Sequence, residues 1–311
     1  MKPSTRRGRG AGLKLLAVGA ACLMLLAACS SDSDSSSDTT SKDTKAKIRI
    51  SSQDFGEQKT LAQVYGQFLE AKGYDVDIQP PIGTRTQIYA ALKADKVDMV
   101  LDYQGSAVVE LGGEASPDPV KTHEALVAKL EPLDLGAGKA SEAVDANALV
   151  ALTTWAKDND VTKISDLSNV SGDLTLAGAP ECAERDDCLK GYNSPEFYGL
   201  SLKFKPVSYG PPLVAALKAN EVQLAQYGTT APEVADGTIV VLEDDKGLQP
   251  AENVVPVFRT AVADDGLVEL LDELSAKLTT ADLAAWNKAT DVEKKDSADV
   301  AEAWLKDNGL I

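Results

Sequence analysis

The stretch Ala90–Val100, AALKADKVDMV, returns later in the chain as Ala215–Ala225, AALKANEVQLA, with six of the eleven positions identical. Each copy has the pattern of a helix end, a polar turn and a short buried strand. Each predicted strand leads to a tyrosine in a loop of small residues, Tyr103 in one copy and Tyr227 in the other. In open α/β sheets, ligands bind beyond the carboxyl ends of the strands. The repeat therefore predicts two α/β lobes that close on one ligand, with chance recurrence of a good helix former as the alternative.

The residues around the first copy alternate between strand and helix patterns. Ile48 and Ile50 alternate with polar residues, as in a half-buried strand, and the apolar residues of Leu61–Leu69 have helical spacing. The expected elements are a strand at Lys47–Ser52, a helix through Leu61–Leu69 that stops at Gly73, a strand at 74–78, a helix at Thr86–Ala94, a strand at Val97–Leu101 and a helix at Val120–Leu130. This order is typical of a mostly parallel sheet.

A second series of strands and helices surrounds the second copy. It comprises a strand at Ala148–Thr153, a helical turn at Ile164–Leu167, a strand at Leu174–Ala177, a helix at Pro211–Ala219, strands at Val222–Gln226, Ile239–Leu242 and Val254–Phe258, and helices at Leu267–Leu278, Thr280–Asn287 and Ser297–Asn308. We expect the last three helices to pack on the first lobe, because the second already has its own set. The chain would then cross between lobes near Asp145 and near Glu243. The first lobe is predicted as residues 47–145 plus 244–311 and the second as 146–243, joined by a two-segment hinge.

Residues 1–28 have the pattern of an export signal. A basic segment precedes the apolar run Leu15–Ala28, which is too short and too early for a spanning helix. The run ends in Leu26-Ala27-Ala28-Cys29, which resembles the lipobox of bacterial lipoproteins. The resemblance implies cleavage before Cys29 and attachment of lipid to its sulfur and its new amino group. The alternative is an ordinary secretory signal with an incidental cysteine.

The segment from Cys29 to residue 46 is predicted to be a disordered tether. Ten of the fifteen residues Ser30–Thr44 are Ser or Thr and four are Asp, so the segment has too little apolar surface to fold. The body would then lie on the extracytoplasmic face of the cell membrane, held by lipid alone. Loss of residues 1–28 would change the formal net charge from −17 to −22, which argues against binding to nucleic acid or anionic lipid.

Two of the four cysteines remain for the exported body. Cys22 lies in the signal and Cys29 takes the lipid, which leaves Cys182 and Cys188 on either side of a short polar loop. A disulfide is the expected state in an exported protein. Zinc is the alternative, but two cysteines without a nearby histidine make a poor site.

The sequence offers little for catalysis. His123 is the only histidine and lies in an exposed-looking Lys-Thr-His-Glu run, so no Ser-His-Asp set can be assembled around it. The chain has no phosphate-binding glycine loop and no dense cluster of metal ligands. We therefore expect no enzyme activity, no cofactor and no metal.

Five segments carry a resemblance that extends from Ile48 to Leu310. They are Ser51-Ser52-Gln53-Asp54-Phe55-Gly56-Glu57-Gln58, Asp102-Tyr103-Gln104-Gly105, Ala179-Pro180-Glu181 leading to Arg185, Val240-Val241-Leu242-Glu243-Asp244-Asp245-Lys246, and Trp304-Leu305-Lys306-Asp307-Asn308-Gly309-Leu310. In this order they resemble the substrate-binding proteins of bacterial osmoprotectant ABC importers, the glycine betaine, choline and proline-betaine group. The resemblance implies a two-lobed fold of the type II periplasmic-binding-protein kind, with mixed sheets flanked by helices and a ligand cleft between the lobes.

The same resemblance implies a set of ligand-binding residues. In this family, aromatic side chains surround the quaternary ammonium group and bind it by cation–π attraction. Matched position by position, Tyr103 and Tyr227 are cage tyrosines, Asn147 and Glu252 replace two further tyrosines, Asp145 presents a backbone carbonyl to the cation, Arg185 and Ser106 face a carboxylate, Gln53 replaces a common lysine, and Thr229 lies beside Tyr227. Half of the aromatic cage is therefore replaced by polar residues.

The function that follows is capture of a small quaternary-ammonium or polar solute for import. The protein is expected to be a monomer that delivers its solute to an ABC permease. A more polar ligand, such as a polyol or a phenolic glycoside, is an alternative within the same transport role. The alternatives of another class are an exported enzyme and a sensor or adhesion lipoprotein on the same fold.

Overall fold

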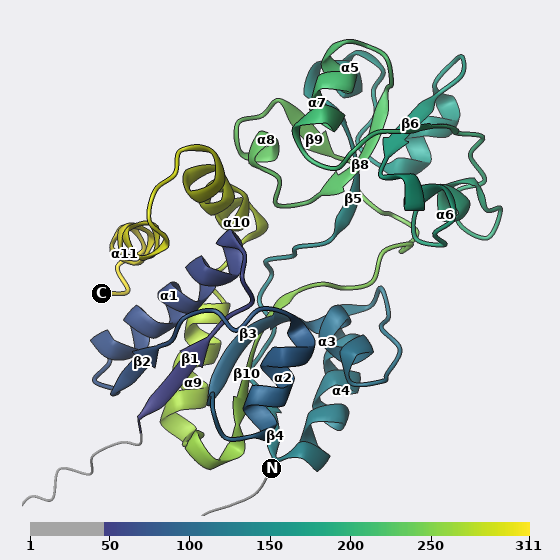
Figure 1. The fold of residues 1–311 in the computed structure, drawn as a ribbon. Helices are drawn as coiled ribbons and strands as arrows, with labels where there is room; N and C mark the ends of the chain where they lie inside the picture. The colour runs from purple at the N-terminus through teal and green to yellow at the C-terminus, as the bar shows by residue number, and fades with distance from the viewer. Residues whose placement is uncertain (1–46) are drawn as a thin grey trace, which may run out of the picture. The chain divides into compact units, whose positions relative to one another are not determined.

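The computed structural model describes residues 47–311, which form two five-stranded sheets with helices packed on both (Figure 1). The predicted signal, Cys29 and the tether lie outside these residues, so those expectations remain predictions. Across the described part of the chain, no helix combines the length and the apolar character that crossing a bilayer needs.

The first sheet has the strand order β2-β1-β3-β10-β4. Its strands are β1 (Ile48–Ser51), β2 (Val76–Ile78), β3 (Met99–Tyr103), β4 (Leu135–Ala137) and β10 (Val254–Arg259). Strands β1, β2 and β3 are parallel, whereas β10 runs antiparallel to β3 and β4. The sheet is therefore mixed, because a strand from the far end of the chain is inserted next to β3.

Helices cover both faces of the first sheet because side chains alternate along each strand. Met99 and Leu101 of β3 pack on one face with helices α1 (Gly56–Ala71), α9 (Asp265–Ser275), α10 (Thr280–Asn287) and α11 (Ser297–Asp307). Val100 lies on the other face with α2 (Arg85–Lys93), α3 (Gln104–Glu110) and α4 (Pro119–Leu130). Residues of the three C-terminal helices therefore share a core with this sheet.

The second sheet has the strand order β7-β6-β8-β5-β9. Its strands are β5 (Asn147–Leu152), β6 (Thr175–Gly178), β7 (Lys203–Pro206), β8 (Leu224–Gly228) and β9 (Ile239–Val241). Four short helices accompany it, α5 (Thr153–Asp158), α6 (Leu189–Asn193), α7 (Pro211–Lys218) and α8 (Pro232–Ala235). Strand β8 is parallel to β6 and antiparallel to β5, so this sheet is mixed in the same way as the first.

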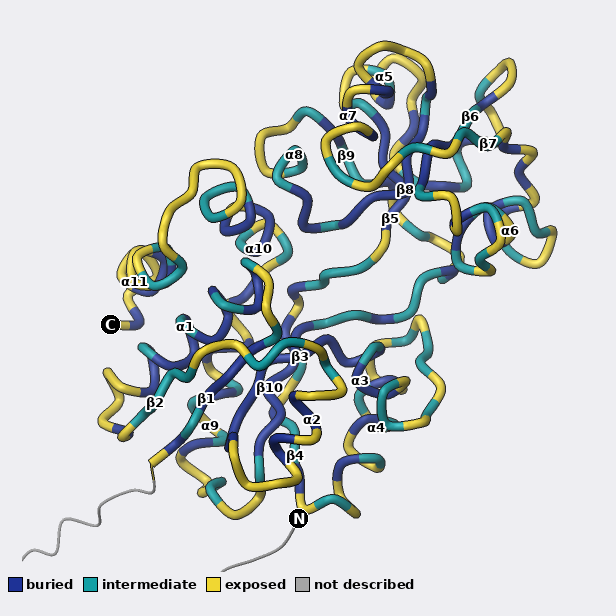
Figure 2. Tube along the Cα trace, in the orientation of Figure 1, coloured by how far each residue is buried: buried dark blue, intermediate teal, exposed yellow. Residues whose placement is uncertain are grey.

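Short irregular turns join these elements. The 3-10 turns lie at Glu131–Leu133, Ile164–Asn169, Pro180–Ala183 and Thr260–Val262, and a π-helical turn lies at Lys288–Val292. The central strands of both sheets are buried along most of their length, while the exposed residues gather at helix surfaces and loop tips (Figure 2). Apolar burial is thus concentrated on the two sheets.

The repeated sequence forms the same structural unit in each sheet. The first copy is the end of α2 followed by β3, and the second is the end of α7 followed by β8; both strands are third in their sheet order. The turn between helix and strand places Asp95 at φ 56° and Asn220 at φ 53°. Asp and Asn tolerate this left-handed conformation better than most residues. The repeat is therefore structural and not a coincidence of helix formers.

The structure differs from the sequence-based expectation after Tyr103. A loop was expected there, but helix α3 begins at Gln104, directly after the last residue of β3. The backbone N–H of Gln104 donates to the carbonyl oxygen of Asn253, which lies next to β10. A tertiary contact therefore fixes the turn that the local sequence did not indicate.

Two extended segments connect the sheets, and they pair with each other. Val144 and Asn253 form an antiparallel bridge, and the N–H of Asp145 donates to the carbonyl oxygen of Glu252. Leu248 still packs in the core of the second sheet, whereas the N–H of Ala251 donates to Ser116, next to α4. These contacts indicate that the chain returns from the second sheet to the first close to Gln249–Ala251, a few residues beyond Glu243.

Candidate functional site

Two adjacent cavities lie where the connecting segments meet the two sheets, and Asp145 and Tyr209 line both of them. The larger, here called the tyrosine cavity, has a volume of about 500 Å³ and is lined by Phe55, Gly56, Glu57, Asp145, Tyr209, Pro211, Tyr227, Thr230, Ala231, Pro232, Glu233, Asn287, Asp291 and Val292. The smaller, here called the Glu252 cavity, has a volume of about 280 Å³ and is lined by Arg85, Tyr103, Ser106, Asp145, Ala146, Asn147, Tyr209, Gly228, Gln249, Pro250 and Glu252.

Glu57 is the most buried carboxylate of the tyrosine cavity, at 3% exposure in the first turn of α1. The hydroxyl of Tyr103 donates to its Oε1 at 2.6 Å. The Nδ2 of Asn287 donates to its Oε2 at 2.6 Å and also to the carbonyl oxygen of Thr230 at 3.0 Å. A buried carboxylate needs such donors, because loss of water otherwise disfavours its charge. The Asn287 contacts also link α10 to the end of β8.

A second carboxylate lies close enough to Glu57 to affect its ionisation. Burial, and then the nearby charge of Asp145, raise the pKa of Glu57 to about 7. Burial likewise raises the pKa of Asp145, whose Oδ1 accepts a hydrogen bond from the hydroxyl of Thr230 at 3.0 Å. Two carboxylates that share a buried site are stabilised by a cation between or beside them. The electrostatics of this cavity therefore favour a positively charged ligand.

Two tyrosine rings border the tyrosine cavity from the second sheet. Tyr227 is buried on β8, and Tyr209 precedes α7 and is 61% exposed. Their ring centroids lie 5.0 Å apart and the rings meet edge to face at 60°. The hydroxyl of Tyr227 donates to Oε2 of Glu233 at 3.4 Å. Aromatic faces beside carboxylates are a favourable surface for an organic cation.

The Glu252 cavity has a different arrangement of donors and acceptors. Glu252 accepts hydrogen bonds from the backbone N–H of Ser106 at 2.9 Å and from its hydroxyl at 2.8 Å. Burial raises the pKa of Glu252. Arg85 is the only Lys or Arg among the residues that line either cavity, and its Nε donates to both carboxylate oxygens of Asp102, at 2.9 and 3.1 Å.

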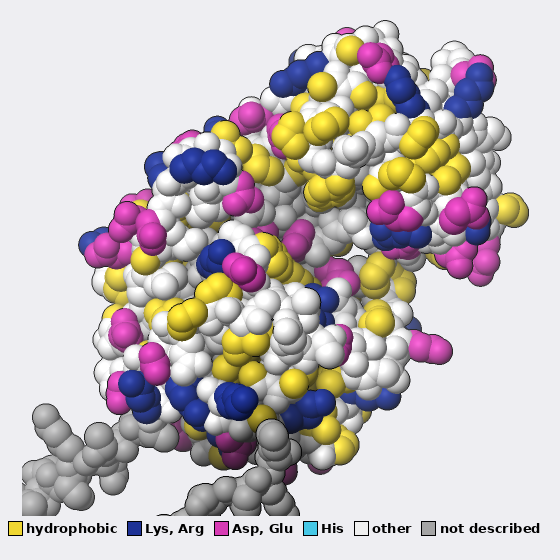
Figure 3. All heavy atoms as spheres, in the orientation of Figure 1, with side chains coloured by type: hydrophobic (Ala, Val, Ile, Leu, Met, Phe, Trp, Pro, Cys, Tyr) yellow, Lys and Arg dark blue, Asp and Glu magenta, His cyan; other side chains and the backbone are white. Residues whose placement is uncertain are grey.

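Six of the predicted ligand-binding residues come together at these cavities. Tyr103, Ser106, Asn147 and Glu252 line the Glu252 cavity, Tyr227 lines the tyrosine cavity, and Asp145 lines both. In the space-filling view, acidic side chains are visible within the hollow of the face that is drawn (Figure 3). The sequence predicted a role only for the backbone carbonyl of Asp145. Its side chain is also held at the site, because Oδ1 accepts a hydrogen bond from the hydroxyl of Thr230, which lines the tyrosine cavity.

Three other predicted residues lie elsewhere. Thr229 binds the connecting segment, because its hydroxyl donates to Val144 at 2.7 Å, and Gln53 forms a bridge with Gly83. Arg185 lines neither cavity; its guanidinium forms an ion pair with Asp187, with Nε donating at 2.8 Å. Their assignment as ligand contacts remains a prediction.

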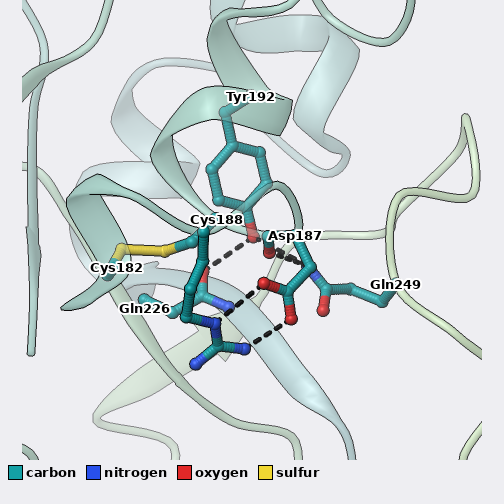
Figure 4. Close-up of a disulfide and its surroundings, with 7 residues drawn as sticks. Cys182, Asp187, Cys188, Tyr192, Gln226 and Gln249 are labelled. Atoms are coloured by element: carbon teal, nitrogen blue, oxygen red, sulfur yellow. Dashed lines mark hydrogen bonds and ion pairs between the residues drawn. A yellow bond between two sulfur atoms is a disulfide. The ribbon is translucent and has the colours of Figure 1, made fainter.

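Cys182 and Cys188 form the predicted disulfide (Figure 4). The ring that it closes is connected to the Glu252 cavity, because Nε2 of Gln249 donates to the carbonyl oxygen of Asp187 at 2.7 Å and Gln249 lines that cavity. Tyr192 follows the ring, and its hydroxyl donates to Oε1 of Gln226 on β8 at 2.8 Å. The disulfide thus supports the segment that carries Gln249.

Sequence reasoning missed Glu57, Tyr209 and Arg85. The repeat offered a weak signal for two of them, because Arg85 is the first residue of α2 and Tyr209 lies two residues before α7. Both residues line the cavities and lie near the start of a repeated helix. Glu57 had no comparable signal, since its role depends on Asn287, which is far away in sequence.

The described residues contain no group of three or more His, Cys, Asp or Glu side chains arranged to hold a metal ion. The chemistry of the two cavities is instead that of tyrosine rings, carboxylates and amides. Tyrosine rings beside carboxylates form a surface suited to a small organic cation.

Comparison with known proteins supports the same reading. Residues 46–307 match the family described as the substrate-binding domain of ABC-type glycine betaine transport systems. A glycine-betaine-binding protein of Pseudomonas aeruginosa is 27% identical over 281 residues, covering 85% of this chain and 88% of the relative. The crystal structure of a glycine betaine/carnitine/choline ABC transporter matches with a TM-score of 0.78 at 21% identity, over 85% of this chain and 99% of the other.

A second solved structure has the same fold. Apo YehZ from Escherichia coli matches with a TM-score of 0.78 at 23% identity, over 86% of this chain and all of the other. The predicted architecture, two mixed sheets flanked by helices, is therefore confirmed.

Proposed function

Because the chain belongs to the family of substrate-binding domains of ABC-type glycine betaine transport systems, we propose that its own ligand is a small quaternary-ammonium solute held in the tyrosine cavity. The family consists of solute-binding proteins and not of enzymes. The chain is accordingly an extracytoplasmic solute-binding protein that acts with the permease of an ABC transporter.

One observation carries the choice of ligand: Tyr209 and Tyr227 border a cavity that also contains Glu57 and Asp145 and no Lys or Arg. An organic cation gains about 0.5–2 kcal/mol from each well-placed aromatic face. The carboxylates add attraction in a partly dehydrated site, where charges are screened less than in water. A neutral polyol would leave these carboxylates without a counter-charge, so the quaternary ammonium is the better match.

The name of the Pseudomonas aeruginosa relative agrees with this ligand class, since that protein is a glycine-betaine-binding protein. We propose Tyr209 and Tyr227 as the aromatic contacts of the head, with Tyr103 in the adjacent Glu252 cavity, and Glu57 and Asp145 as the charged contacts. The residues that line the tyrosine cavity come from elements of both sheets, α1 and α10 on one side and β8 on the other. Ligand binding would therefore draw two lobes together, the second beginning at residue 146 and ending close to Gln249.

Calorimetric titration of the processed protein with choline and glycine betaine tests the site. We expect Tyr227→Ala to weaken binding by about tenfold or more, which corresponds to about 1.4 kcal/mol. Tyr227→Phe is the matched control, because it keeps the ring and removes only the long contact to Glu233. Equal affinity in the wild type and in Tyr227→Ala would remove this tyrosine from the site, and no binding of either solute by the wild type would overturn the proposed ligand.

We further propose that the processed protein is a monomer anchored by lipid on Cys29. The lipid anchor is supported by the apolar run, the small residues before Cys29 and the Ser-rich segment after it. Cys29→Ser should release the protein from the membrane fraction, whereas Cys22→Ser should not. Retention of the Cys29→Ser variant would contradict the anchor.

A further inference from the structure

We propose that Glu252 makes the site select a ligand whose tail donates hydrogen bonds and reject one whose tail carries a carboxylate. The preferred ligand is then a net cation with a hydroxyl or amine tail, and a zwitterion is disfavoured. This inference rests on the proposed function, because it assumes that a quaternary ammonium head occupies the tyrosine cavity.

The position of the tail follows from the two cavities. Asp145 and Tyr209 line both cavities, so the two cavities are neighbours and these residues mark the boundary between them. A head packed against the Tyr209–Tyr227 pair, on the side of Asp145, places the rest of the ligand toward the Glu252 cavity. The groups that line this second cavity therefore decide which tails are accepted.

The donors of Ser106 that would suit a ligand carboxylate are already used. Ser106 offers two, its backbone N–H and its hydroxyl, and both are donated to Glu252, at 2.9 and 2.8 Å. A carboxylate tail would have to take these donors from Glu252 and leave a buried carboxylate with fewer partners, which is unfavourable. A hydroxyl or amine tail would instead donate to Glu252, which has remaining acceptor capacity.

The charges around the tail have the same effect. Arg85 carries the one positive charge of the lining, and Asp102 binds it through Nε. With Arg85, Asp102 and Glu252 ionised, this group has a formal net charge of −1. A carboxylate tail would add a second negative charge beside Glu252, and like charges in a partly buried site repel.

An unused acceptor in the tyrosine cavity points to the same kind of ligand. Asn287 is 9% exposed, and its Oδ1 has no hydrogen-bond partner among the described residues, whereas its Nδ2 makes two bonds. Glu57, Asp145 and Glu233 add only acceptors when ionised. The combined lining therefore presents an excess of acceptors, which a donor-bearing cation satisfies and a zwitterion does not.

Three probes with the same trimethylammonium head separate the contributions of head and tail. Choline has a hydroxyl tail, glycine betaine has a carboxylate tail, and tetramethylammonium has neither. Titrated into the processed protein, choline should bind best and glycine betaine worst, with a ratio of about tenfold or more between them. Comparing each probe with tetramethylammonium shows whether its tail strengthens or weakens binding.

Glu252→Gln removes the charge at nearly constant shape and should lower the choline-to-betaine ratio by about fivefold or more. Glu252→Asp keeps the charge and should preserve the order of the probes, and it provides a second test if the first variant folds poorly. Glu142→Gln is the control, because Glu142 is exposed and lines neither cavity; it should leave the ratio unchanged.

The possible failures can be told apart. If the wild type binds glycine betaine as tightly as choline, or if Glu252→Gln leaves the ratio unaltered, the inference is wrong while the proposed function stands. If none of the three probes binds, the shared head is not recognised, and both the proposed function and this inference are overturned.

Discussion

Among single residues, Glu57 has the environment most sensitive to pH. Its carboxylate is buried, receives hydrogen bonds from Tyr103 and Asn287, and lies near Asp145. Burial and the Asp145 charge raise its pKa from an ordinary value of 4.5 to about 7. The folded protein therefore holds this proton more tightly than the unfolded chain. The stability that results is fully present below pH 4.5 and is lost as the pH rises through 7.

Cation binding should depend on pH in the opposite direction. A bound cation favours ionised Glu57, so affinity for choline should increase as the pH rises through 7, by up to about tenfold between pH 6 and pH 8. Titrations at these two values measure the effect. Glu57→Gln, which cannot ionise, should flatten the profile; an equally steep profile in this variant would assign the proton to another group, such as Asp145.

The residues predicted from sequence and those missed differ in what fixes their position. Tyr103 and Tyr227 follow from local pattern, because each ends a buried strand and strand ends face a ligand site in α/β sheets. Glu57 reaches the site only because α10 returns to α1 and brings Asn287 against it. Contacts across so long a sequence separation leave no periodic signal, and no reading of a single sequence can identify them.

Among the elements, the disulfide ring offers a direct stability test. The disulfide between Cys182 and Cys188, which are six positions apart in the sequence, restricts the unfolded chain. The Cys182→Ser/Cys188→Ser double variant should lose about 2 kcal/mol of unfolding free energy, measured by urea denaturation. Adding a reductant should destabilise the wild type by a similar amount and leave the double variant unaffected. Equal midpoints for the two proteins would show that the ring contributes nothing.

The helix–strand turn of the repeat gives a second test at this scale. Asn220 is exposed and has φ 53°, a conformation that strains a residue with an ordinary side chain. Asn220→Ala should therefore lower the unfolding free energy by about 1 kcal/mol, while Asn220→Gly, the matched control, should be close to neutral. Destabilisation by glycine as large as that by alanine would point to a lost side-chain contact instead of backbone strain.

The long or strongly periodic elements, such as α1 and α9, were identified from sequence. The short β4, β7 and α8, with three, four and four residues, were missed. Elements of this length show little period of their own, and the three-residue strands β2 and β9 were identified only because their apolar pattern extends into the flanking residues. Helix α3 was missed for another reason, since its start depends on the bond from Gln104 to Asn253.

For the whole molecule, the link between ligand and shape is the main expectation. Glu57 belongs to a helix on the first sheet and Tyr227 to a strand of the second, yet both line the tyrosine cavity. A ligand that contacts both should favour a more compact form. Small-angle scattering should show a smaller radius of gyration with choline than without it. Tyr227→Ala at the same choline concentration should remain at the unliganded value, and a wild type that stays unchanged at saturation would exclude closure.

The fold class and the number of sheets were predictable because the repeat and the strand–helix alternation are local patterns. The position at which the chain leaves the second sheet was harder to predict. Asp244–Gln249 is polar and looks like a linker, but Asp244 accepts hydrogen bonds from Tyr198 and from the N–H groups of Leu248 and Gln249. These contacts attach the segment to the second sheet's core in a way that composition alone does not indicate.

The insertion of β10 between β3 and β4 has a consequence for the order in which the chain assembles. As the chain emerges from its N-terminal end, every strand of the second sheet, from Asn147 to Val241, is available before Val254 appears. Until then β4 lacks the only neighbour that it has in the sheet order, and β3 presents an unpaired edge to other chains. The first sheet, whose strands β1 to β4 come first in the sequence, is thus completed last. We expect the newly exported protein to be most prone to aggregation in the interval before β10 pairs with β3 and β4.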